Sequence, residues 1–250
     1  MAKIAELFAK AQSHHHAGRF AEAQHGYEAI LRTEPRHADA LNLLGTALAQ
    51  QGQAETGIGF ILKAIEVRPN TAAFYNNLGV LRQDVKDYEM ARQAFEQARA
   101  IDSQFSDPVY NLAKLYKQLD QLDAAILAYI RVLDIDPGRV DAMINLGNIL
   151  FDSGRLDEAI ETFQRAADAD AHPSIGARAY LNLGNTYRRM GRDHEALAAY
   201  DAALDREPHD GLRIKRALTL PVVMESWDHI HETRAAFAEV DNDKNGLETF

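Results

Sequence analysis

The feature that most constrains this chain is a short motif that returns at a nearly constant interval. A leucine followed by a small residue recurs in a series whose small residues are Gly45, Gly79, Ala113, Gly147 and Gly184. The successive intervals are 34, 34, 34 and 37 residues. A fixed period of about 20 to 50 residues indicates a stack of similar units, each too small to bury its apolar face alone. The sequence therefore predicts a repeat array rather than a single globular core.

Further residues recur with the same period. A second small residue follows each motif after twelve positions, and a bulky residue comes four positions later. The small residues are Gly57, Ala91, Ala125, Ala159 and Ala196, with Ala23 from an earlier and weaker copy, and the bulky residues are Tyr27, Ile61, Phe95, Tyr129, Phe163 and Tyr200. Prolines close four of the copies, at Pro35, Pro69, Pro137 and Pro208. Together these series mark six copies, from about residue 4 to residue 208.

Each copy predicts two amphipathic helices joined by a tight turn. In the fifth copy, apolar residues recur at helical spacing on both sides of the segment SGR at 153–155. A glycine in such a turn ends the first helix. The paired small residues let two helices cross closely while a large neighbour fills the adjacent groove. The proline ends the second helix, because it cannot donate the next backbone hydrogen bond.

This period and these residues resemble the tetratricopeptide repeat, a helix–turn–helix unit of 34 residues. The resemblance covers about four fifths of the chain. It implies an all-α, right-handed superhelical solenoid of six repeats with a C-terminal helical cap. The expected repeats span about 4–35, 38–69, 72–103, 106–137, 140–171 and 177–208. The three residues inserted around 170–174 predict an extra loop before the sixth repeat.

The pattern changes after Pro208. A helix from Leu212 to Leu220, stopped by Pro221, and a second helix capped by Ser226 predict capping elements over 209–240, followed by a polar tail at 241–250. The segment RIKRALTLPV also resembles one in bacterial proteins whose tetratricopeptide repeats lead into a glycosyltransferase domain related to O-linked N-acetylglucosamine transferases. That resemblance implies that this chain is the front portion of such a protein, without its catalytic domain.

A row of asparagines gives the candidate site. They stand two residues before the small residue in four consecutive copies, at Asn77, Asn111, Asn145 and Asn182. A carboxamide can bond both the N–H and the C=O of an extended peptide. Such a peptide advances about 3.3 Å per residue, so each repeat, with helices about 10 Å across, would span about three residues. The alternative is that tandem duplication copied a tolerated polar residue at an exposed position.

The resemblance favours the peptide-binding interpretation. In O-linked N-acetylglucosamine transferases an asparagine at this place lines the inner surface of the repeats as a ladder that grips substrate polypeptide. The second copy departs from the row, because Asn42 comes one residue early and Leu43 occupies the matching place. One residue is about 100° of helix rotation. We therefore expect Asn42 to point away from the row.

Composition argues against other classes of function. A net charge of −10 disfavours nucleic acid, and the absence of cysteine excludes disulfides and thiolate zinc sites. No apolar run approaches a membrane span, and the start of the chain lacks the pattern of a signal peptide, which predicts a cytoplasmic protein. The segment DNDKNG at 241–246 matches only half of a calcium loop. We find no catalytic constellation, and predict no enzyme, metal or cofactor.

The predicted function is thus a protein-interaction module whose concave face binds an extended peptide of a partner protein. Its predicted setting is the substrate-recruiting part of a glycosyltransferase. The open alternative is a free-standing scaffold that assembles with copies of itself, so that a homo-oligomer is a second kind of partner.

Overall fold

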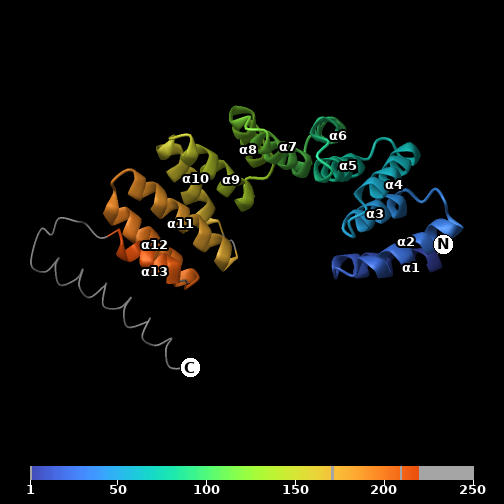
Figure 1. Cartoon of the computed structure of the whole chain (residues 1–250), viewed down its shortest axis with the longest axis horizontal. Helices are drawn as coiled ribbons and strands as arrows, with labels where there is room; N and C mark the ends of the chain where they lie inside the picture. Colours follow the sequence, from blue (N-terminus) through green and yellow to red (C-terminus); the bar gives the residue numbers. More distant parts are fainter. Residues whose placement is uncertain (1, 170–171, 209, 220–250) are drawn as a thin grey trace, which may run out of the picture. The chain divides into compact units, whose positions relative to one another are not determined.

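The computed structural model describes residues 2–169, 172–208 and 210–219, and all regular elements in these ranges are α-helices (Figure 1). The chain divides into two compact units, residues 1–136 and 137–250. Within each unit, consecutive helices form pairs that stack along the chain. The predicted all-α repeat fold is therefore confirmed.

The first unit contains four helix pairs. They are α1 (Ala2–His16) with α2 (Phe20–Thr33), α3 (Ala38–Ala49) with α4 (Ala54–Val67), α5 (Ala72–Asp84) with α6 (Tyr88–Ile101), and α7 (Ser106–Gln118) with α8 (Leu122–Ile135). The second helix of each pair packs against the first helix of the next. The core thus continues from repeat to repeat, as expected of an array in which each unit covers its neighbour.

The second unit contains two pairs and a further helix. They are α9 (Val140–Asp152) with α10 (Leu156–Asp168), α11 (Pro173–Arg189) with α12 (Asp193–Arg206), and α13 (Asp210–Ala217). Helix α13 packs on α12. It ends three residues before the predicted Leu220, and the predicted helix from Ser226, the tail and the segment 241–246 lie outside the described residues.

The prediction of an extra loop at 170–174 is wrong for Pro173 and Ser174, which are helical, whereas residues 170 and 171 lie outside the described residues. Helix α11 begins at Pro173, with the proline in its first turn, and runs for 17 residues. The first turn of a helix has no intrahelical partner for its N–H groups, so proline is well tolerated there. The inserted residues therefore lengthen the first helix of the sixth repeat, which starts four positions before the expected residue 177.

The small residues of the motif lie where the two helices of a pair cross. A Cβ atom added at Gly79 would lie 2.5 Å from the ring of Phe95. The same distance separates a Cβ at Gly147 from Phe163 and one at Gly184 from Tyr200. The bulky residues themselves are almost completely buried. The structure thus gives the mechanical reason that the sequence predicted for pairing a small residue with a large one.

Candidate functional site

The four asparagines of the row lie on the first helices of four consecutive pairs. Asn77 on α5 and Asn111 on α7 belong to the first unit, whereas Asn145 on α9 and Asn182 on α11 belong to the second. All four side chains are half-buried. We call the side of the first helices that carries them the ladder face, and describe it separately in each unit.

In the first unit each ladder asparagine is bound to the repeat before it. The Nδ2 of Asn77 donates to the Oδ1 of Asn42 at 3.1 Å. The Nδ2 of Asn111 donates to the Oδ1 of Asn76 at 3.0 Å. The acceptors are buried, with exposed fractions of 5% for Asn42 and 9% for Asn76. Each bond joins two neighbouring repeats and satisfies a buried carbonyl that would otherwise be costly to leave unpaired.

These acceptors were not recognised in the sequence as part of the site. The expectation that Asn42 points away from the row is wrong, because the buried Asn42 side chain accepts a hydrogen bond from Asn77 of the row. The available signal was the doubled asparagine at 76–77, whose first member faces the next repeat. The row therefore has two layers, one half-exposed and one buried.

In the second unit a ladder asparagine is also hydrogen-bonded to the repeat before it, but the acceptor stands at a different place in that repeat. The Nδ2 of Asn182 donates to the Oδ1 of Asn148 at 2.9 Å. The Oδ1 of Asn185 receives hydrogen bonds from the hydroxyl of Tyr200 at 3.0 Å and from the Nζ of Lys215 at 3.3 Å. The second asparagine of both NLGN motifs, at 145–148 and 182–185, is thus the acceptor for a group that follows later in the chain.

The hydrogen bonds between repeats use only part of the hydrogen-bonding capacity of the ladder amides. A carboxamide has two N–H groups and a carbonyl with two lone pairs. In Asn77, Asn111 and Asn182 the bond to the preceding repeat uses one N–H. It also fixes which way the amide faces, which lowers the entropy lost when a further group binds.

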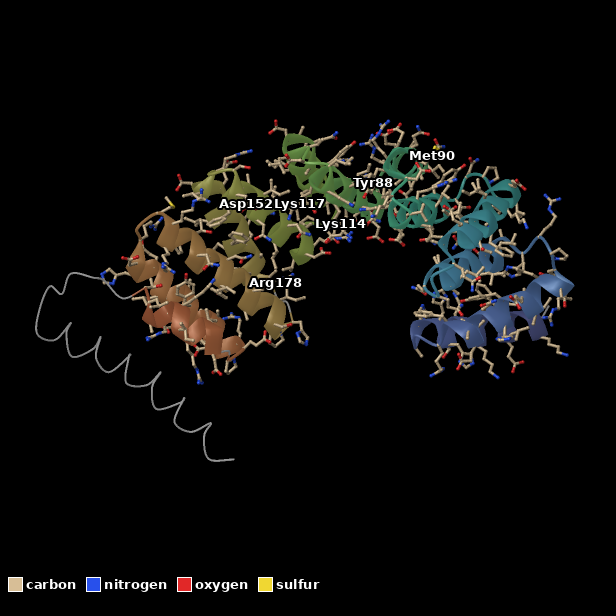
Figure 2. The ribbon with its side chains drawn as sticks, in the orientation of Figure 1. Tyr88, Met90, Lys114, Lys117, Asp152 and Arg178 are labelled. Carbon is tan, nitrogen blue, oxygen red and sulfur yellow. The ribbon has the colours of Figure 1, made fainter. Side chains whose placement is uncertain are left out.

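Polar groups border the ladder face of the first unit. Gln83 donates to Gln118 at 2.7 Å, and Gln118 donates to the hydroxyl of Tyr88 at 3.0 Å, which links α5, α7 and α6. Lys114, one turn after Asn111 on α7, has its Nζ 5.8 Å from the centre of the Tyr110 ring (Figure 2). This surface offers uncharged donors and acceptors together with the positive charge of Lys114.

Metal-binding clusters and membrane-spanning helices are both absent from residues 2–169, 172–208 and 210–219. Over these ranges no group of three or more histidine, cysteine, aspartate or glutamate side chains is placed to hold a metal ion. None of the described helices combines the length and apolar character required to cross a membrane.

Models of one family, the tetratricopeptide repeat, match residues 7–24, 36–104, 107–139 and 138–206, which is more than half of the chain. A curated relative is an N-terminal acetyltransferase A complex subunit-like protein of Schizosaccharomyces pombe. It is 22% identical over 145 residues, which are 56% of this chain and 21% of that protein. This chain thus spans about a fifth of that relative's length.

Three solved structures show the same fold. YrrB, described as a TPR protein with an unusual peptide-binding site, is 24% identical with a TM-score of 0.59, over 76% of this chain and 96% of that one. PilF of Pseudomonas aeruginosa is 16% identical with a TM-score of 0.70, over 85% and 95%. A protein from Parabacteroides merdae is 18% identical with a TM-score of 0.61, over 97% and 93%.

Proposed function

Because this chain belongs to the tetratricopeptide repeat family, we propose that it is a non-catalytic cytoplasmic module that binds an extended segment of a partner protein. The observation that carries the proposal is the fixed orientation of the half-exposed ladder amides. In the first unit, buried acceptors one repeat away hold Asn77 and Asn111. YrrB, which shares the fold, is described as having a peptide-binding site.

The ladder binds the main chain of the peptide. The carbonyl of each asparagine accepts a peptide N–H, and its second N–H donates to a peptide C=O. The peptide therefore has to be extended, because a helix would use these groups internally. In the first unit the binding residues are Asn77 and Asn111, and in the second they are Asn145 and Asn182. Recognition through the main chain makes this part of the interaction tolerant of peptide sequence.

A matched pair of variants tests the proposal. Asn111→Ala removes a ladder amide together with its bond to Asn76, whereas Asn76→Ala removes the same bond from its buried side. We expect Asn111→Ala to lose about 2 kcal/mol of stability, because it leaves the buried carbonyl of Asn76 unpaired, and Asn76→Ala to lose about 1 kcal/mol. Only Asn111→Ala removes the group that contacts the peptide, and its peptide affinity should fall by about tenfold, since each 1.4 kcal/mol corresponds to about that factor.

The probe is the strongest binder from a library of random peptides about six residues long, the length that the two ladder repeats of the first unit span at about three residues each. Affinities are measured by isothermal titration calorimetry with the full chain. Asn76→Ala also removes the bond that orients Asn111, so it should lose some affinity. The proposal requires this loss to be smaller than the loss in Asn111→Ala by at least about threefold. Equal loss in both variants would mean that the asparagines only brace the repeats. A library that yields no binder would also contradict the proposal.

The glycosyltransferase setting is a finer proposal that rests on the segment at 213–222. We expect an antibody against the repeats to detect a native protein well above 27.9 kDa in the source cells. A band at 27.9 kDa would contradict this setting and favour the free-standing scaffold. Light scattering would then identify a self-assembling chain by a mass that rises with protein concentration.

A further inference from the structure

Charge is distributed unevenly between the helices of the second unit. Helix α11, which carries a ladder asparagine, contains three arginines and no acidic residue. Helices α10 and α12, the second helices of their pairs, each contain four acidic residues and a single arginine. The short α13 adds two arginines and a lysine against one aspartate. A protein with a net charge of −10 therefore concentrates cations on α11 and α13.

The cations of α11 share a face with its asparagines. Arg178, Asn182, Asn185 and Arg189 follow one another at spacings of four, three and four residues. These spacings place side chains one above the other on a single face of a helix. Lys215 of α13 joins the same group, since its Nζ lies 3.3 Å from the Oδ1 of Asn185. We call these five residues the cationic stripe.

The two ends of the cationic stripe differ in their contacts. Arg189 donates to the backbone carbonyl of Phe151 at 2.8 Å and lies over that ring, 4.8 Å from its centre. This contact fixes Arg189 against α9. Arg178 is exposed (Figure 2) and forms no ion pair with any residue in the described ranges. Of the two arginines of the stripe, Arg189 is therefore held in place and Arg178 is available for an anionic group.

Several acids on the second helices are already paired with local cations. Arg155 holds Glu158 at 2.6 Å, and Arg192 holds Glu195 at 2.8 Å. Arg216 of α13 also holds Asp201 of α12. On α9, Asp141 pairs with Arg139 at 3.1 Å, whereas the exposed Asp152 forms no ion pair within the described residues. These pairings leave the stripe as the part of the unit suited to anions.

We propose that the cationic stripe binds an acidic, extended segment of a partner protein. The inference rests on the proposed function, because the amide of Asn182 would hold the peptide main chain. Asn185 would contribute only its Nδ2, since its carbonyl already accepts from Tyr200 and Lys215. Arg178 and Lys215 then pair with its carboxylates. Alternate side chains of an extended peptide point to the same side, so an acidic residue at every second position presents its charges to the stripe together.

The remainder of the unit favours an acidic peptide over a nucleic acid. A long polyanion would meet the acidic surfaces of α10 and α12 and the net charge of −10, which repel it at a distance. A short peptide with a few carboxylates reaches only the stripe. The amides also match the alternating donors and acceptors of a peptide backbone, which a sugar–phosphate backbone lacks.

The experiment compares two synthetic peptides of about eight residues, roughly the span of two repeats with a short overhang. One alternates glutamate and serine, and the other has glutamine in place of each glutamate. Fluorescence anisotropy with the full chain should show at least about tenfold tighter binding of the glutamate peptide at low salt. Added salt should narrow the difference, because it screens exposed charges.

Two charge-reversal variants test whether the preference for the glutamate peptide depends on the cationic stripe. Arg178→Glu should weaken binding of the glutamate peptide by about tenfold, because it replaces an attraction by a repulsion. Arg165→Glu changes the net charge equally but lies on α10, and its exposed side chain makes no interaction among the described residues. It should alter binding by less than about twofold, as expected for a distant exposed charge.

The outcomes separate this inference from the proposed function. Equal binding of both peptides would overturn the charge preference and leave the ladder proposal standing. If the glutamate peptide binds but Asn182→Ala leaves its affinity unchanged, the stripe stands and the ladder fails in this unit. Absence of binding by the glutamate peptide overturns the inference. So does tighter binding of a single-stranded oligonucleotide of equal charge, which would assign the stripe to nucleic acid.

Discussion

Replacing Gly57 by leucine is expected to lower the free energy of unfolding of the first unit by about 3 kcal/mol, the upper part of the range for overpacking a core. A Cβ atom at Gly57 on α4 would lie 2.4 Å from the carbonyl oxygen of Gly45 on α3 and 3.1 Å from a methyl carbon of Leu81. The closest of these atoms belongs to the backbone, so the side chain fits only if α3 and α4 move apart.

Gly59 on the same helix provides the control. A Cβ atom there would have no neighbour within 4 Å, and the position is exposed. Gly59→Leu should therefore stabilise the unit by about 0.5 to 1 kcal/mol, since glycine is a poor residue inside a helix. Urea unfolding followed by circular dichroism measures both variants. Hydrogen exchange in α3 to α5 shows whether the effect is local, as expected where each repeat mainly contacts its neighbours. Equal behaviour of the two variants would show that α3 and α4 do not require close contact.

Much of the fold could be predicted because the residues that recur with the period are the ones that determine how the helices pack. A small residue opposite a bulky one fixes where two helices cross, as Gly147 and Phe163 do. The structure of the inserted segment was harder to predict, because extra residues between repeats can form a loop or lengthen a helix. Pro173 marked a boundary in the sequence, yet proline is compatible with both outcomes. In the structure it occupies the first turn of α11.

Only part of the candidate site could be predicted, because the sequence shows which residues recur but not how neighbouring helices are rotated. The asparagine row follows directly from the period, but its hydrogen-bond partners depend on how neighbouring helices are rotated. Asn77 bonds to a residue 35 positions earlier, whereas Asn182 bonds to one 34 positions earlier. No single spacing in the sequence predicts both bonds. The cationic stripe was also missed. Arg178 lies on the same helix as Asn182, but Lys215 is 30 residues away from Asn185 and meets it only because α13 packs on α12.

Tyr200 joins the last repeat to α13, and its replacement by alanine is expected to cost about 4 kcal/mol. Its side chain has an exposed fraction of 0% and packs in a cluster with Ala196, Ala203 and Leu212, the last of which belongs to α13. Its ring also lies against Gly184, where an added Cβ would be 2.5 Å away. Removing the ring therefore opens a cavity between α11 and α12 and removes the apolar surface that Leu212 of α13 contacts.

Tyr200→Phe separates the ring from its hydroxyl. The hydroxyl donates to the Oδ1 of Asn185 at 3.0 Å, and burial raises the pKa of Tyr200, so the group remains a protonated donor at neutral pH. Asn185 keeps its bond to Lys215 in this variant, and the loss should be about 1 kcal/mol, as for a single hydrogen bond. Trypsin cleavage after Lys215 and Arg216 should accelerate strongly in Tyr200→Ala and only slightly in Tyr200→Phe. If both variants are cleaved equally fast, the hydroxyl network rather than the packed ring holds α13, and the cationic stripe would then depend on that same network.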